Sequence, residues 1–285
     1  MIGFARTDAL LRCDGVSLER AAAEHGTPLY VYSRATLEAA YQAYAKAFAA
    51  VPHRICYAVK ANGSGALLRL FAGLGAGADI VSGGELMAAR RAGFPPERIV
   101  FAGVGKSEQE IALGLSHGIG EWNAESEEEI ARIAAAAAAR GARARVALRV
   151  NPDIDARSHP YISTGLRETK FGVDIGEAPA ILRRVRGLAG VEVVGVQCHI
   201  GSQITEIEPI TSAAQALADL SRRLLDEGFA LQTIDIGGGL GVSYDGGGVP
   251  DPARLAAAVL PAIKGLPLLL LLEPGRSLWR RPARC

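Results

Sequence analysis

The sequence predicts an α/β protein folded as a single (β/α)8 barrel. Eight short apolar runs alternate with amphipathic helical segments, and no Pro- or Ser-rich linker divides the chain. Several runs are almost continuously hydrophobic, as expected of parallel strands that are covered on both faces. The 285 residues suit one such barrel, which needs about 250 residues. A doubly wound open sheet is the alternative architecture.

The predicted barrel strands are all short apolar stretches that precede a turn or a helix start. In chain order they cover residues 55–60, 78–82, 99–103, 119–124, 145–151, 193–200, 233–239 and 268–275. A further short strand is predicted at residues 29–33, followed by a helix that Ser33 opens. These two elements would precede the barrel or cover its bottom.

The segments between the strands carry signals of helix ends. Ser107–Glu110 and Ser126–Glu129 have the spacing of capping boxes, and Asp251 stands before a proline suited to the first helical position. Gly93 and Gly141 follow apolar periodicity and are expected to end helices. The predicted helices therefore alternate with the predicted strands, as a barrel requires.

Composition narrows the class of protein. The net charge is +1, so no charge excess directs the chain to nucleic acid or to an anionic membrane. The apolar run at 266–272 is too short for a bilayer, which needs about 20 residues, and the first residues do not resemble a secretory signal. The four cysteines lack CxxC pairing and metal-ligand spacing. We expect a soluble cytoplasmic protein without a metal site, in which Cys56 and Cys198 are reduced core residues.

Polar residues gather where the predicted strands end. A (β/α)8 barrel assembles its active site from the carboxyl ends of different strands. The residues at these positions are Lys60, Asn62, Asp79, Ser82, Arg149, Asn151, His199, Ser202, Gly237–Gly239, Glu273 and Arg276. The set is more informative than any one member.

Each of these residues also has a purely structural interpretation. Lys60 could be a solvated side chain, and His199 could be a hydrogen-bonded core residue. Gly237–Gly239 could simply mark a turn. Asp79 and Arg149 could form an ion pair with each other inside the barrel mouth.

A functional interpretation accounts for the residues together. A phosphate-bearing cofactor needs a glycine-lined anion site, which barrels often place after strands seven and eight. A Schiff base needs a lysine whose pKa is lowered by an apolar setting. An electron sink needs a carboxylate beside a ring nitrogen, and an aromatic side chain can stack on the ring. Gly237–Gly239, Lys60, Glu273 and His199 supply these parts in turn, although residues 273–276 could also be a plain turn.

Nine motifs carry a resemblance to a known family. They are YAVKAN (57–62), ADIVSGGEL (78–86), FAGVGKS (101–107), ALRVNPDID (147–155), HPYISTG (159–165), KFG (170–172), CHIGSQI (198–204), DIGGGLG (235–241) and EPGRS (273–277). From about Val16 to Ser277 the chain resembles the diaminopimelate decarboxylases. These are pyridoxal-phosphate (PLP) enzymes with an alanine-racemase type of barrel, related to ornithine and arginine decarboxylases.

The resemblance implies a role for each residue near the cofactor ring. Lys60 would carry the cofactor as a Schiff base, and His199 would stack on its ring. Glu273 would pair with the ring nitrogen. Asp79 and Arg149 would orient the lysine and the cofactor.

The resemblance also implies the phosphate site and the reaction. Ser202, Gly238, Gly239, Gly275 and Arg276 would surround the phosphate, and Arg276 could reach the substrate as well. The reaction would be decarboxylation of meso-diaminopimelate to L-lysine and carbon dioxide, the last step of lysine biosynthesis. Another basic amino acid, ornithine or arginine, is the alternative substrate. Family members are homodimers.

The end of the chain departs from the family pattern. The resemblance implies an N-terminal segment (1–28), a PLP-binding barrel (29–277) and a tail (278–285) in place of the family's C-terminal β-domain. Cys285 does not match the cysteine motif of that domain, and Gly63–Gly65 stands where relatives usually carry a less flexible stretch. The alternative function is therefore a PLP-binding barrel with little or no turnover. A non-catalytic product of a damaged gene is a third possibility.

Overall fold

The computed structural model of the chain describes residues 3–7, 10–155, 171–244 and 246–279. The HPYISTG motif at 159–165 and most of the predicted tail, residues 280–285, lie outside the described residues. Within the described ranges, every helix is too short or too polar to cross a lipid bilayer.

The predicted (β/α)8 barrel is confirmed. Eight parallel strands form a closed ring in the order β4 (His53–Ala58), β5 (Gly77–Ile80), β6 (Ile99–Phe101), β7 (Glu121–Ala124), β8 (Ala144–Asn151), β10 (Val191–Gln197), β11 (Thr233–Asp235) and β12 (Leu269–Leu272). The pairing of β12 with β4 closes the ring, because Leu270 lies opposite His53. The open-sheet alternative is therefore wrong. A short strand, β9 (Val173–Asp174), pairs with β8 outside the ring.

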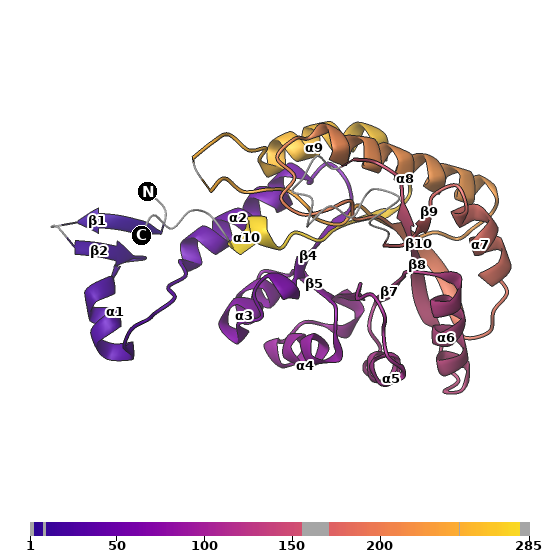
Figure 1. The fold of residues 1–285 in the computed structure, drawn as a ribbon, viewed down its shortest axis with the longest axis horizontal. Coiled ribbons are helices and arrows are strands. Elements are labelled where there is room, and N and C mark those ends of the chain that lie inside the picture. Colours follow the sequence, from indigo (N-terminus) through magenta and orange to yellow (C-terminus); the bar gives the residue numbers. More distant parts are fainter. Residues whose placement is uncertain (1–2, 8–9, 156–170, 245, 280–285) are drawn as a thin grey trace.

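Helices form the outer layer of the barrel, as Figure 1 shows. They are α2 (Arg34–Ala47), α3 (Gly65–Gly73), α4 (Gly83–Ala92), α5 (Glu108–His117), α6 (Glu127–Ala138), α7 (Ala178–Val185), α8 (Glu208–Asp226), α9 (Pro252–Ile263) and α10 (Arg276–Trp279). Two short 3₁₀ helices, η1 (Val59–Ala61) and η2 (Pro96–Arg98), lie in the connections. Six of the eight strands end earlier than the predicted apolar runs, so His199, Gly237–Gly239 and Glu273 lie in loops. Asp79, Arg149 and Asn151 lie within β5 and β8.

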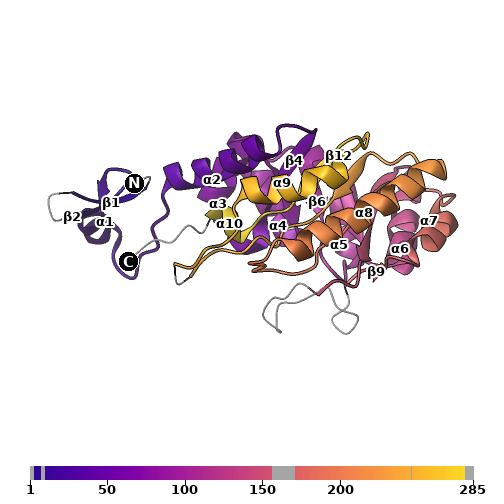
Figure 2. The same cartoon turned by 90° about the horizontal axis from the view of Figure 1, so that it is seen from above.

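A small N-terminal unit stands apart from the barrel. Strands β1 (Phe4–Thr7), β2 (Leu10–Cys13) and β3 (Val16–Ser17) form an antiparallel sheet next to α1 (Leu18–His25). Figures 1 and 2 both place this unit at one end of the long axis, with α6 and α7 at the other.

The strand predicted at residues 29–33 does not form. This segment links α1 to α2, pairs with no described strand, and exposes 85% of Tyr30. Its run of aromatic and β-branched residues is typical of a strand, but a strand needs a neighbour to pair with. The helix predicted after it is confirmed, since the Ser33 side chain accepts a hydrogen bond from the Thr36 N–H.

The two predicted capping boxes have different outcomes. At Ser107 both reciprocal hydrogen bonds with Glu110 form. At Ser126 only the hydroxyl bond forms, with the Glu129 N–H donating at 3.2 Å. The Glu129 carboxylate instead accepts from the Glu125 N–H at 2.8 Å, so this helix start is tied to the preceding loop. The remaining predicted helix-end residues lie at or just beyond helix ends: Gly93, Gly141 and Asp251.

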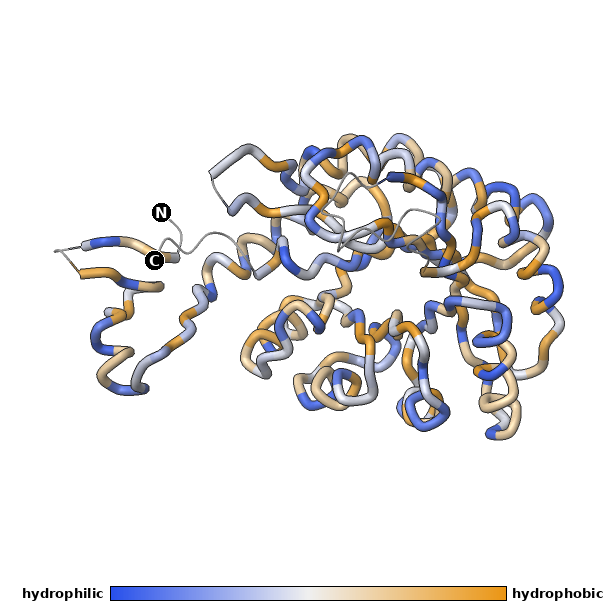
Figure 3. Tube along the Cα trace, in the orientation of Figure 1, coloured by the Kyte–Doolittle hydropathy of each residue, from blue (hydrophilic) through white to orange (hydrophobic). Residues whose placement is uncertain are grey.

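Apolar packing is concentrated between strands and helices, and the barrel interior is mixed. Figure 3 shows hydrophobic segments along the inner strands and hydrophilic segments on the outer faces of the helices. Inside the ring, Cys56, Val100 and Leu271 form a small apolar cluster, and the predicted burial of Cys56 and Cys198 is confirmed. Toward the carboxyl ends of the strands, buried polar side chains replace apolar ones. The fold therefore places its polar interior where a barrel carries its active site.

Candidate active site

A pocket of about 380 Å³ opens at the carboxyl ends of the barrel strands. The loops after β4, β10, β11 and β12 line it, through Ala58, Lys60, Ala61, His199, Ser202, Gln203, Gly239, Leu240, Tyr244, Glu273, Gly275, Arg276, Ser277 and Trp279. Small-molecule sites in proteins occupy roughly 300–1,000 Å³, so the volume suits a cofactor or a metabolite. Seven of the ten residues that the sequence singled out for the site line this one pocket.

Lys60 is held at the pocket by a buried carboxylate. It lies in η1, directly after β4, and its Nζ donates to Asp79 Oδ2 at 3.0 Å. The Lys60 side chain is 49% exposed and that of Asp79 is fully buried. The expected lowering of the lysine pKa is wrong. The charge of Asp79 raises the pKa of Lys60, and this effect outweighs burial, which acts in the opposite direction.

Arg149 has a different partner from the one that the structural interpretation expected. Its Nη1 donates to Glu125 Oε1 at 2.6 Å, while Asp79 pairs with Lys60. The predicted pairing of Asp79 with Arg149 is therefore wrong. The Arg149 guanidinium also lies over the Phe171 ring, with 5.2 Å to its centroid. Arg149 is thus a buried cation beside the pocket and is not part of its lining.

His199 contacts the glycine loop. The Gly238 N–H donates to His199 Nδ1 at 3.3 Å, so this nitrogen acts as an acceptor. Burial lowers the pKa of His199 to about 3, and the charges of Lys60 and Arg149 add to this effect. The ring is therefore neutral at neutral pH. A neutral imidazole can stack on an aromatic group.

The glycine loop after β11 requires glycine at each position. Gly237 and Gly239 have φ angles of +67° and +106°, which favour glycine. A Cβ at Gly238 would collide with the Glu273 carbonyl oxygen, and one at Gly239 would lie 2.6 Å from the Gly201 carbonyl oxygen. The absence of side chains lets three loops approach one another closely, so that backbone N–H groups can face a bound anion.

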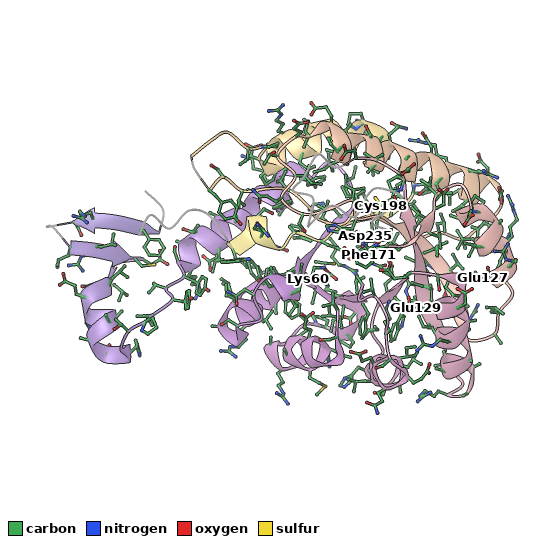
Figure 4. All side chains as sticks on the ribbon, in the orientation of Figure 1. Lys60, Glu127, Glu129, Phe171, Cys198 and Asp235 are labelled. Atoms are coloured by element: carbon green, nitrogen blue, oxygen red, sulfur yellow. The ribbon has the colours of Figure 1, made fainter. Side chains whose placement is uncertain are left out.

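Glu273 forms the floor of the pocket. It is 5% exposed and accepts hydrogen bonds from Asn123 Nδ2 at 3.2 Å and from Gln197 Nε2 at 3.3 Å. Burial raises the pKa of Glu273 well above its ordinary value, and the neighbouring carboxyls of Asp235 and Asp79 raise it further. Figure 4 shows Asp235 and Lys60 in the central part of the barrel.

Arg276 lies at the rim, at the start of α10. Its guanidinium donates a hydrogen bond to the Tyr244 hydroxyl and lies over the Tyr244 ring, with 5.9 Å to the centroid. Tyr244 is 54% exposed, so the pair borders the solvent side of the pocket. Ser202 and Gly275, which the sequence predicted beside a phosphate, also line the pocket.

Three of the polar strand-end residues serve local structure instead. The Ser82 hydroxyl caps α4 by accepting from the Glu85 N–H. The side-chain oxygens of Asn62 and Asn151 accept backbone N–H groups two residues further on. For these three the structural interpretation is supported.

Sequence reasoning missed the polar residues beneath the pocket. Asn123, Gln197 and Asp235 lie inside predicted strands, and all three are buried. Their signal was a polar side chain within an apolar run, which marks a strand position facing a polar interior. Tyr244 and Trp279 were missed as well, and they lie in loop and helix segments without such a signal.

A larger groove of about 580 Å³ lies between α2 and α3. Its lining residues include Leu37, Leu67 and Leu70, and contain no lysine. The chemistry of the side chains, and not the volume, identifies the barrel mouth as the candidate active site.

The fold and the site together define a class of barrel protein. Its members place a lysine, a buried carboxylate and a glycine loop at the carboxyl end of a parallel barrel. Residues 34–279 match the family described as pyridoxal-dependent decarboxylase, pyridoxal binding domain, and the chain belongs to this family. The cofactor of the family is pyridoxal phosphate.

Known relatives agree with this membership. The chain is 48% identical over 275 residues to a diaminopimelate decarboxylase of Pseudomonas aeruginosa, covering 96% of the chain and 66% of that relative. A diaminopimelate decarboxylase of Helicobacter pylori, solved in complex with L-lysine, superimposes with a TM-score of 0.89 at 43% identity, covering 92% of this chain and 66% of that one. A diaminopimelate decarboxylase of M. jannaschii, also solved in complex with L-lysine, has a TM-score of 0.90 at 37% identity. The match covers 97% of this chain and 67% of that one. The chain thus spans just under two thirds of the curated relative's length.

Proposed function

We propose that the whole protein is a PLP-dependent carboxy-lyase that converts meso-diaminopimelate to L-lysine and carbon dioxide. The observation that carries the proposal is the convergence of Lys60, His199 and Glu273 on one pocket at the barrel mouth. The names of the relatives support the substrate, and L-lysine in the related structures corresponds to the product.

The residues of the pocket fit the cofactor. The close approach of the glycine loop to neighbouring backbone leaves N–H groups without covering side chains, as a phosphate site requires. Ser202, Gly238, Gly239, Gly275 and Arg276 would hold the phosphate, and Arg276 would supply the positive charge. Lys60 would hold the cofactor covalently, since it is the pocket's lysine.

The bound cofactor supplies an electron sink for the electrons left when carbon dioxide departs. Around it, each residue of this chain has a separate task. Glu273 holds a proton at the pocket floor, where it would contact the ring nitrogen. The neutral His199 ring would stack on the cofactor ring. Asp79 orients the Lys60 amine through the 3.0 Å bond, and Arg149 adds a buried positive charge nearby.

Arg276 would also recognise the substrate. Diaminopimelate carries two carboxylates, and a guanidinium binds a carboxylate well because its donors match the two oxygens. Tyr244 fixes the position of the Arg276 guanidinium at the rim. This arrangement favours a diacid over ornithine or arginine, which have no distal carboxylate.

The domain bounds, the oligomeric state and the cellular location each have a separate test. Residues 29–277 would form the PLP-binding domain, whose boundaries limited proteolysis can locate. The protein would act as a homodimer, to be measured by sedimentation of the whole protein. It would reside in the cytoplasm, to be checked by cell fractionation.

The test of the function has two parts. Borohydride reduction in the presence of PLP should fix a label on Lys60, and Lys60→Ala should abolish it, while Lys264→Ala, at an exposed lysine, should leave it intact. The whole protein should then form lysine from meso-diaminopimelate and leave ornithine and arginine unreacted. A label that survives in Lys60→Ala, or preferred turnover of ornithine, would overturn the proposal.

A further inference from the structure

Directly beneath the pocket, two carboxyl groups share one amide donor. Asn123 Nδ2, on β7, lies 3.4 Å from Asp235 Oδ2 and 3.2 Å from Glu273 Oε1. Asp235 ends β11 and is fully buried, and Glu273 follows β12 and is 5% exposed. Two carboxylates this close in a buried site repel each other strongly, so the pair is expected to keep one proton.

The two carboxyls have different surroundings. Asp235 Oδ1 accepts the Gly237 N–H at 2.7 Å, a short bond to a group that can only donate. The Glu273 carboxyl accepts from side-chain amides, at the longer distances of 3.2 and 3.3 Å, and faces the pocket. The shorter backbone bond favours the negative charge on Asp235.

Asp235 and Glu273 are also linked through Gly237. The Gly237 N–H donates to the Asp235 side chain, and the Gly237 carbonyl accepts the Glu273 backbone N–H at 2.8 Å. The first glycine of the loop is thereby held between the two residues. Two hydrogen bonds therefore connect the carboxyl pair to the glycine loop.

We propose that Asp235 is a positioning residue for Glu273: it carries the charge of the pair and keeps the shared proton on Glu273, at the pocket floor. The consequence for a pyridine nitrogen rests on the proposed function, because a protonated Glu273 presents its proton where that nitrogen would bind. The location of the proton in the cofactor-free protein does not depend on the proposed function.

The charges around the pair support placing the proton on Glu273 and the negative charge on Asp235. Burial raises the pKa of Asp235 to about 6, and the pKa of Glu273 is raised well above its ordinary value. Asp79, on β5, disfavours ionisation of both groups, and Lys60, on η1, favours ionisation of Glu273. Other ionisable groups near the pair, among the described residues, are Glu121 on β7, Arg149 on β8, His199 after β10 and the buried thiols of Cys56 and Cys198.

The test is infrared titration of the cofactor-free chain in D₂O, following the band of protonated carboxyl groups. Asp235→Asn keeps the side-chain size and an oxygen for the Gly237 N–H, but removes the charge. Glu273→Gln removes the proposed proton site. Both substitutions are made in a Glu121→Gln background, because Glu121 is a buried carboxyl whose pKa is also raised and whose band would otherwise overlap that of Glu273. Thermal unfolding of each variant establishes that it is folded.

The Glu121→Gln background should retain a carboxyl band above the pH at which Asp235 ionises, and adding Glu273→Gln should abolish it. Adding Asp235→Asn instead should make the band disappear at lower pH. A persistent band in Glu273→Gln, or an unchanged titration in Asp235→Asn, would overturn the proposal. PLP binding, measured separately by absorbance, tests the proposed function. If the parent does not bind PLP, that function is refuted, whereas the result on the carboxyl pair remains valid.

Discussion

Lys60 and Asp79 form an ion pair in which the two partners have very different exposure. Nζ lies 3.0 Å from Oδ2, the lysine faces the pocket, and the carboxylate is fully buried. Asp79 Oδ1 is buried and accepts no hydrogen bond from the described residues. A buried carboxylate with this single partner depends on the lysine for compensation of its charge. The same bond holds the Lys60 amine in its protonated form.

Asp79→Asn should therefore lower the pKa of the Lys60 amine. With the carboxylate gone, burial becomes the largest influence and lowers that pKa; of the weaker ones, Glu273 raises it and Arg149 lowers it. A larger fraction of free amine at neutral pH should speed condensation with PLP, and the pH midpoint of the rate should decrease. Stopped-flow absorbance across pH measures this rate.

Asp226→Asn is the matched control for that experiment, since it removes the same charge from an exposed position at the end of α8. Its rate profile should coincide with that of the parent. A midpoint that rises in Asp79→Asn, or stays where it was, would show that Asp79 does not control the amine.

Glu121 should make stability depend on pH. Its burial raises the pKa from 4.5 to about 7, and the neighbouring charge of Asp235 contributes. The folded state then binds more protons than the unfolded state between these values, so stability should fall as pH rises from about 4.5 to about 7. Each pKa unit corresponds to about 1.4 kcal/mol, which gives on the order of 3 kcal/mol.

Glu121→Gln should remove this part of the pH dependence, because a glutamine does not ionise. Thr233 Oγ1 can still donate to the side-chain oxygen, as it does to Glu121 Oε2 at 2.9 Å. Urea unfolding at several pH values measures the slope. An equal slope in parent and variant would place the titrating group elsewhere.

The strands were predictable because their flanking signals were strong. Each apolar run is followed by a turn or a helix cap, and Ser107 and Ser33 open helices where the sequence indicated. Residues 29–33 have the composition of a strand but no strand beside them, which local sequence does not reveal. Strand formation depends on a neighbour far away in the chain, and helix capping does not.

The buried polar residues beneath the pocket were harder to predict for a geometric reason. In a barrel both faces of each strand are buried, so the two-residue alternation that marks an inward face is weak. Asn123 and Asp235 consequently did not stand out from the apolar residues beside them. The pKa of Lys60 was mispredicted because the prediction considered only burial in its own strand, whereas the structure shows a 3.0 Å ion pair with Asp79 of the neighbouring strand.

Lys106 is a buried cation that the sequence did not single out. Its side chain is fully buried, and Nζ donates to the carbonyls of Gly103 and Asn123 at 2.8 and 2.7 Å and to Glu129 Oε1 at 3.2 Å. These bonds use all three ammonium protons. They join the loop after β6, the end of β7 and the start of α6, which together position the Asn123 amide.

Lys106→Met should destabilise the protein by about 3–5 kcal/mol, because it leaves Glu129 and two buried carbonyls without their donor. Lys264→Met, at an exposed position after α9, should change stability by less than about 0.5 kcal/mol. Urea unfolding of the three proteins measures the difference. Similar stabilities for both variants would show that the buried amine contributes no net stability.

Tyr244→Phe should weaken substrate binding through Arg276. The hydroxyl accepts a hydrogen bond from the guanidinium, whereas the stacked ring is retained in phenylalanine. The bond positions the guanidinium at an exposed rim, and a hydrogen bond to a charged group contributes about 1.5 kcal/mol at the lower end, so KM for diaminopimelate should rise by up to about tenfold. PLP affinity should also be measured. A large loss of PLP affinity with an unchanged KM would assign Arg276 to the phosphate alone.

Glu273→Gln in the whole protein should separate cofactor binding from turnover. The phosphate site supplies most of the anchoring, so PLP affinity should remain close to that of the parent. A glutamine cannot hold the proton at the pocket floor, and loss of one such electrostatic contact typically slows turnover by about 100-fold or more. Equilibrium binding of PLP and the rate of lysine formation are the two measurements. Glu121→Gln, which changes a buried carboxyl outside the pocket lining, should retain both values. Unchanged turnover with weakened PLP affinity in Glu273→Gln would make Glu273 a binding residue and leave the electron sink to be supported by another group.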